Sequence, residues 1–250
     1  MGAEPAPFRW PEGKRAALSL SFDDARPSQL DQGLPVLDAH GVKATFYVSP
    51  ANMERRVDDW KAAAANGHEI ANHTLTHPCS GNFRFAQNNA LEDYTIEQIE
   101  ADILGGTEAI ERMIGVTPTT FAYPCGQKFV GRGEGVVSYV PLVAKHFIAG
   151  RGAFDESHND PPLCDLAQLF GMAMDDEPFA RLKALLDHAV EDDGGWLVLF
   201  GHDVGPQGAR QVTRTDALDE LCRYATDPAT GIWTDTVEAV GRYVEERMGG

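Results

Sequence analysis

Two short segments about fifty residues apart hold residue types that can bind a metal ion and activate water. The first ends an apolar run with two adjacent carboxylates, Asp23 and Asp24. The second places two imidazoles, His73 and His77, four positions apart. One carboxylate and two histidines are a ligand set for a catalytic divalent metal that keeps an open coordination position. The other aspartate is then free to act as a base, and the combination predicts a metal-dependent hydrolase.

A third polar group, His202, follows the last strongly apolar run of the chain. A histidine with a pKa near its usual value of about 6.5 can protonate a leaving nitrogen or oxygen. We therefore expect His202 to complete the site. The other histidines have no such placement and are interpreted as structural or solvated: His40, His68, His146, His158 and His188.

Apolar runs and periodic segments alternate along the chain, and the polar groups follow the runs. The predicted strands cover residues 16–22, 44–48, 68–71, 119–122, 146–149 and 195–200. The predicted helices cover residues 28–40, 54–66, 95–114, 134–145, 178–192, 208–225 and 234–248. This alternation predicts a parallel sheet covered by helices, with a site at the carboxyl edge of the strands.

The chain of 250 residues has a net charge of −17 and an isoelectric point near 4.7. Such acidity argues against binding to nucleic acid or to anionic lipid. No apolar run approaches the roughly 18 residues of a membrane span, and no signal peptide is visible at the start. We expect one catalytic domain over residues 1–250, with a core at about 14–205 and helices at 208–248 packed on it. A secreted or periplasmic location after signal removal and a cytoplasmic one both stay open, as does the oligomeric state.

The motifs match those of a known family. The chain resembles the polysaccharide deacetylases of carbohydrate esterase family four from about residue 14 to residue 203. The family's Thr/Ser-Phe-Asp-Asp motif is present at Ser21–Asp24, and its His-Ser/Thr-x-x-His-Pro motif at His73–Pro78. Its closing Leu-x-Leu…His motif resembles Leu197–His202, with one extra residue before the histidine. The resemblance implies an α/β fold, a distorted TIM-like (β/α) barrel with fewer than eight complete strands.

The resemblance also implies a role for each of these polar residues. Asp23 would be the general base and His202 the general acid. Asp24, His73 and His77 would be the metal ligands. The expected metal is Zn²⁺, with Co²⁺, Ni²⁺ or Mn²⁺ as alternatives.

Two motifs depart from the family pattern. The third, Arg-x-Pro-x-Gly, aligns with residues 122–126, where the arginine that orients the catalytic aspartate is absent. We expect Arg151 to reach the same pocket from another direction, and the backbone N–H of Cys125 to be the oxyanion donor. The fourth motif, Asp-x-x-Asp-Trp, has no clear counterpart in residues 151–158, so the group that tunes His202 stays unassigned.

The four cysteines, Cys79, Cys125, Cys164 and Cys222, lack the Cys-x-x-Cys spacing of a structural zinc cluster. A disulfide between Cys79 and Cys125 and four unpaired thiols both stay open.

Three functions fit these observations. The first is removal of N-acetyl or O-acetyl groups from a carbohydrate of the chitin, peptidoglycan or xylan type. The second keeps the metal site but hydrolyses a small cyclic amide or ureide, as an allantoinase does. The third is a non-catalytic sugar-binding protein, which the intact set of acidic and histidine residues argues against. The aromatic and amide residues at 80–89 form either a wall of a sugar subsite or a solvated loop.

Overall fold

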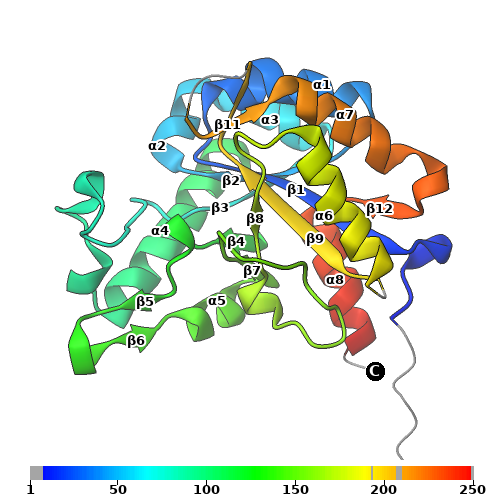
Figure 1. Cartoon of the computed structure of the whole chain (residues 1–250). Coiled ribbons are helices and arrows are strands. Elements are labelled where there is room, and N and C mark those ends of the chain that lie inside the picture. Colours follow the sequence, from blue (N-terminus) through cyan, green and yellow to red (C-terminus); the bar gives the residue numbers. More distant parts are fainter. Residues whose placement is uncertain (1–7, 193, 207–209, 249–250) are drawn as a thin grey trace, which may run out of the picture.

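A curled parallel sheet with helices on its outer face forms the frame of the computed structural model, which describes residues 8–192, 194–206 and 210–248 (Figure 1). The strands lie in the order β7-β4-β3-β2-β1-β9-β8, and β12 pairs with the start of β1. Their bounds are β1 Ala16–Asp23, β2 Thr45–Val48, β3 Glu69–Asn72, β4 Thr120–Ala122, β7 Ala149–Arg151, β8 Met172–Ala173, β9 Trp196–Gly201 and β12 Ile232–Thr234. This open half-barrel confirms the predicted α/β fold class.

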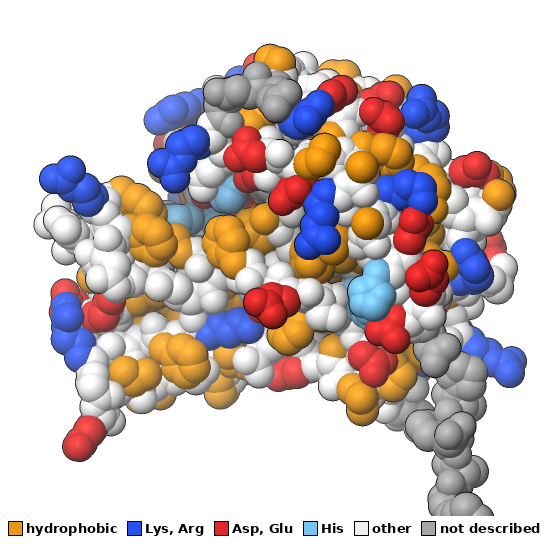
Figure 2. Space-filling view, in the orientation of Figure 1, with side chains coloured by type: hydrophobic (Ala, Val, Ile, Leu, Met, Phe, Trp, Pro, Cys, Tyr) orange, Lys and Arg blue, Asp and Glu red, His pale blue; other side chains and the backbone are white. Residues whose placement is uncertain are grey.

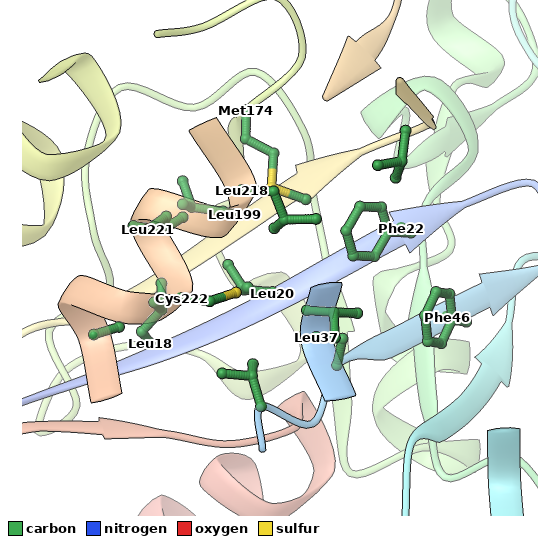
Figure 3. Packing of buried hydrophobic residues seen from close by; sticks show 14 of the residues in the cluster. Leu18, Leu20, Phe22, Leu37, Phe46, Met174, Leu199, Leu218, Leu221 and Cys222 are labelled. Atoms are coloured by element: carbon green, nitrogen blue, oxygen red, sulfur yellow. The ribbon is translucent and has the colours of Figure 1, made fainter. Parts of the chain in front are cut away.

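The central strand β1 shows how the sequence builds this frame. Successive side chains on a strand point to opposite faces, and Leu18, Leu20 and Phe22 point to the outer face. There they pack with Leu37 and Leu221 from two covering helices (Figure 3). Each such fully buried side chain contributes about 1.5–3 kcal/mol to stability, so the outer face anchors β1 firmly.

The inner face of β1 carries small residues instead of large ones. Ala17, Ser19 and Ser21 alternate with the outer residues, and Asp23 ends the same row. The hydroxyl of Ser19 accepts a hydrogen bond of 3.0 Å from the indole N–H of Trp196. The row therefore leads along the inside of the sheet to a carboxylate at its carboxyl edge.

The helices are α1 Leu34–Ala39, α2 Pro50–Met53, α3 Val57–Ala65, α4 Ile96–Ile114, α5 Val140–His146, α6 Phe179–Glu191, α7 Thr215–Thr226 and α8 Val237–Met248. Helix α8 packs Val240 and Val244 against Trp196 of β9 and Ala149 of β7. The first backbone N–H groups of α8 meet a carboxylate from the sheet. Glu69 on β3 accepts the N–H of residue 238 at 2.9 Å. Burial raises the pKa of Glu69 to about 7.

Several predicted element bounds are wrong. The helix expected over 134–145 begins at Val140, because Pro141 suits the first turn of a helix and not its interior. Residues 137–138 form β6, which pairs antiparallel with β5, Phe129–Val130. The strand expected over 146–149 is β7, three residues long and ending at Arg151.

The helix expected over 208–225 also differs, since α7 begins at Thr215. It follows β11, Val212–Arg214, which pairs with β10, Asp203–Gly205. Residues 208 and 209 lie outside the described part of the chain. Within that part, each helix is too short or too polar to cross a membrane.

Candidate active site

A cavity of about 740 Å³ opens at the carboxyl edge of the sheet, beyond the ends of β1, β3, β4 and β9. Figure 2 shows a recess on this face, with histidine surface between hydrophobic side chains. Six of the seven predicted site residues line the cavity: Asp23, Asp24, His73, His77, Cys125 and His202. The seventh, Arg151, lies behind Asp23 and is fully buried.

Three of these residues converge as a metal ligand set. Oδ1 of Asp24 lies 3.8 Å from Nε2 of His73 and 3.5 Å from Nε2 of His77. One ligand atom from each residue lies within 4.8 Å of the other two. The backbone takes the left-handed conformation at Asp24 and at His77, with φ of 76° and 54°. Both turns leave the extended path of the preceding strand and bring these side chains to one point.

The protonation of His73 suits a ligand. Its Nδ1 lies 2.9 Å from the carbonyl oxygen of Ala122. Because a carbonyl can only accept, Nδ1 carries the hydrogen and the lone pair lies on Nε2, which faces Asp24. Burial lowers the pKa of His73 to about 4, so the ring is neutral at neutral pH. The residues present therefore fit a bound divalent metal.

Arg26 holds the second oxygen of Asp24. Its Nε and Nη2 donate to Oδ2 at 3.2 and 3.0 Å, and its Nη1 donates to Asp203 at 2.7 Å. Oδ1 of Asp24 is thus the oxygen that faces His73 and His77. Burial alone would raise the pKa of Asp24, but the neighbouring histidines and Arg26 outweigh it and hold that pKa below its usual value.

Helix α4 supports the loop that carries the two histidines. Oδ1 of Asp102 accepts the backbone N–H groups of Leu75 and Thr76 at 2.9 and 3.0 Å. At Gly106, an added Cβ would lie 2.9 Å from the carbonyl carbon of Thr74. The close approach of helix and loop therefore requires glycine at this position.

Asp23 is paired with the arginine expected from β7. Nη2 of Arg151 donates to Oδ1 of Asp23, and Nη1 donates to the carbonyl of Gly152 at 2.9 Å. The guanidinium carbon lies 5.0 Å from the ring centre of Tyr47 and 4.9 Å from that of Phe200. The arginine thus stands where it can orient the carboxylate, although it comes from a different strand than the family motif implies.

His202 has an aspartate partner that the sequence did not reveal. Nδ1 of His202 lies 2.6 Å from Oδ2 of Asp175, and the other oxygen of Asp175 accepts the backbone N–H of His202 and the hydroxyl of Thr213. Burial lowers the pKa of His202, but the bond to Asp175 and the nearby Asp23 outweigh it, and the net shift is upward. Asp175 follows β8, a strand of two residues that the sequence did not indicate. A polar residue just after a strand was the pattern that could have found it.

Two loops meet at the cavity through a disulfide. Cys79 and Cys125 form a disulfide, with their Cα atoms 6.2 Å apart. Of the two alternatives that the sequence left open, this structure therefore has the disulfide. Cys125 has a φ of 55° and is among the residues that line the cavity. Cys164 and Cys222 are free.

Exposed aromatic rings stand around the cavity mouth. Phe83 and Phe85, from the segment after the histidine motif, stack with ring centres 5.4 Å apart. Phe154 lies in the loop after β7 and packs edge-on against Phe200. Phe85 and Phe154 are 66% and 68% exposed, so each presents apolar surface to solvent beside the cavity.

The sequence matches a family model described as polysaccharide deacetylase over residues 10–130. A gellan lyase of a Bacillus species is 30% identical over 57% of this chain and 5% of that protein. A chitooligosaccharide deacetylase of Rhizobium leguminosarum bv. trifolii is 45% identical over 24% of this chain and 29% of its own. A peptidoglycan-N-acetylglucosamine deacetylase of Bacillus cereus is 30% identical over 48% and 44%. The chain thus spans less than half the length of these relatives.

Solved structures share the fold. A candidate polysaccharide deacetylase from Mycobacterium smegmatis has a TM-score of 0.71 and 19% identity, covering 98% of this chain and 95% of its own. A family 4 acetyl xylan esterase from Clostridium thermocellum, solved with a cobalt ion, has a TM-score of 0.58 and 20% identity, covering 89% of each chain.

Proposed function

Because the chain belongs to the polysaccharide deacetylase family through residues 10–130, we propose that it is a metal-dependent hydrolase that removes acetyl groups from a carbohydrate. One observation carries the proposal. A ligand set, a buried carboxylate held by an arginine, and a histidine held by an aspartate all face one cavity. These are the parts that acyl transfer to water needs.

Asp24, His73 and His77 would hold the metal, with Zn²⁺ first and Co²⁺, Ni²⁺ or Mn²⁺ as alternatives. A bound metal of this kind would lower the pKa of water and polarise the acyl carbonyl. The neutral Nε2 of His73 and the free Oδ1 of Asp24 are suited to this task. Arg26 holds the ligand carboxylate in place through its other oxygen.

The remaining residues would move protons and stabilise charge. Asp23 would accept the proton of the attacking water, held in position by Arg151. The backbone N–H of Cys125 would donate to the oxygen on which negative charge develops. His202, whose pKa is raised by the bond to Asp175, would give a proton to the leaving amine or alcohol. Acetate and the deacetylated sugar would then be released.

The rim favours a sugar chain as substrate. Phe83, Phe85 and Phe154 present exposed ring surface at the cavity mouth. Aromatic rings of this kind pack against apolar surfaces, and the carbon-bound hydrogens of a pyranose ring provide one. A substrate that extends beyond the cavity would contact this rim.

Acetate release from acetylated xylan, chitin oligomers and peptidoglycan tests the proposal, with and without a chelator and with elemental analysis of the protein. We expect release from at least one polymer, loss with chelator and recovery on adding Zn²⁺. Asp23→Asn should keep the metal and lose turnover, whereas His77→Ala should lose both. His40→Ala, which removes a hydrogen bond to Asp219 away from the cavity, is the matched control and should change neither.

No acetate from any polymer, together with hydrolysis of a cyclic ureide by the metal-loaded protein, would replace this proposal by the allantoinase-like alternative. No turnover of either class, with sugar binding retained, would favour a binding protein.

A further inference from the structure

We propose that reduction of the Cys79–Cys125 disulfide uncovers a second metal site, formed by the two thiolates and Nδ1 of His77, for a thiophilic divalent cation such as Zn²⁺. This site is distinct from the one at Asp24, because it uses the opposite nitrogen of the His77 ring. It does not depend on the proposed deacetylase activity.

The three donor atoms already lie together. Sγ of Cys79 is 3.7 Å from Nδ1 of His77, and one ligand atom each from His77, Cys79 and Cys125 lies within 4.8 Å of the others. Zinc bonds sulfur at about 2.3 Å, so tetrahedral geometry places two thiolates about 3.8 Å apart. Once the covalent bond is broken, a modest separation of the sulfurs meets this requirement. Two cysteines and one histidine leave a fourth position for water or another ligand.

Contacts other than the disulfide keep the two loops together. The backbone N–H of Ser80 donates to Oε1 of Gln127 at 2.6 Å, which joins the residue after Cys79 to the second residue after Cys125. The carbonyl of Cys79 also accepts the N–H of Leu91 at 3.0 Å, and the carbonyl of Leu91 accepts the N–H of Gly131, in the segment after Cys125, at 3.0 Å. Reduction therefore frees the sulfurs without releasing the segments that carry them.

The redox step has an accessible route. Cys79 is fully buried, whereas Cys125 is half-buried and lines the cavity. An external dithiol can attack the sulfur of Cys125 from the cavity side and then close its own disulfide, supplying two electrons and two protons to the cysteines. Each thiol loses its proton when the cation binds. In the oxidised chain neither sulfur carries a negative charge, so the second site is then absent.

The shared ring makes the two sites compete. A neutral imidazole has one lone pair and one N–H. In the oxidised chain Nε2 of His77 faces Asp24, and the hydrogen on Nδ1 can point toward the sulfur of Cys79. A cation held by Nδ1 leaves the hydrogen on Nε2, which removes that nitrogen from the first site. Metal bound to the reduced cysteines therefore weakens metal binding at Asp24 and His73.

Cobalt titration of the full metal-free chain tests this inference, since thiolate–Co²⁺ bonds give strong charge-transfer absorption in the near ultraviolet. The protein is titrated oxidised, and again after reduction with dithiothreitol and anaerobic removal of the reductant. We expect the absorption only in the reduced chain, saturating at one equivalent. It should vanish in Cys79→Ser and in Cys125→Ser, and His77→Ala should weaken the binding at least tenfold. The matched controls Cys164→Ser and Cys222→Ser should retain it.

Two results would overturn the inference: a reduced wild-type chain without the absorption, or absorption of wild-type strength in either Cys79→Ser or Cys125→Ser. Circular dichroism of both serine variants would check that they are folded, and Cys125→Ser is the less disruptive of the two because Cys125 is only half-buried. The outcome stays separate from the deacetylase proposal. If no form of the protein releases acetate, the cobalt absorption still reports whether the thiolate site exists. If the oxidised chain does release acetate, the cobalt absorption of the reduced chain still decides the question of the thiolate site.

Discussion

The buried pair between Arg151 and Asp23 offers the strongest test of the site's architecture. Arg151→Ala removes a guanidinium that is fully buried between two aromatic rings and leaves Asp23 buried without its counter-charge. Breaking one partner of a buried ion pair costs about 3–5 kcal/mol. The same change leaves the proposed base unoriented, which should lower kcat by about 10²–10⁴-fold. Urea unfolding of the metal-free chain and acetate release measure the two effects.

Two further variants separate charge from geometry. Arg151→Lys keeps the positive charge but loses the planar group that stacks between the rings and bonds Asp23 and the Gly152 carbonyl from two nitrogens, so we expect an intermediate loss in both assays. Arg132→Ala removes an exposed arginine paired with Asp93 and is the matched control, with little expected change. If the free energy of unfolding of Arg151→Ala is within about 1 kcal/mol of the wild-type value and its turnover is normal, the positioning role assigned to Arg151 is wrong.

Three other changes probe separate parts of the structure. Asp175→Asn removes the carboxylate that raises the pKa of His202, so the alkaline limb of the kcat/KM profile should move to lower pH; an unmoved limb would show that another group is the acid. Glu69 has a folded pKa of about 7 against an ordinary value of 4.5, so its protonated form stabilises the fold below pH 4.5 and this contribution is lost as the pH rises through 7. The unfolding free energy of the wild type relative to Glu69→Gln should therefore fall across that range in denaturant titrations, and a constant difference would contradict the burial argument. Phe85→Ala should raise KM for a polymer about fivefold, equivalent to about 1 kcal/mol, while Phe129→Ala, an exposed ring outside the cavity lining, should not.

The ligand set could be predicted from sequence because its chemistry is local. Residue type and spacing were sufficient to propose one carboxylate of the Asp23–Asp24 pair with His73 and His77, because each motif directly follows a strand. The choice of Asp24 as the ligand came from the family resemblance. The alternation of strands and helices predicted a parallel sheet covered by helices. The distorted barrel was implied by the family resemblance.

Contacts across the fold were harder to foresee. Arg151 was expected at the pocket, but its pairing with Asp23, 128 residues away, depends on the order of the strands, which the intervening sequence does not fix. Asp175 was missed because β8 has only two residues and therefore no detectable periodicity. The bounds of α5 and α7 shifted for a related reason, since turn and bridge contacts decide where such segments begin.

Helix α4 carries a consequence for anyone who engineers this chain. The helix lies outside the cavity and would be an obvious target for random substitution. Asp102 and Gly106 on its inner side nevertheless set the shape of the loop that carries His73 and His77. Neither residue is among those lining the cavity. A mutagenesis library designed from distance to the reaction centre alone would include both positions, and its inactive clones would be misread as failures of chemistry when they are failures of loop support.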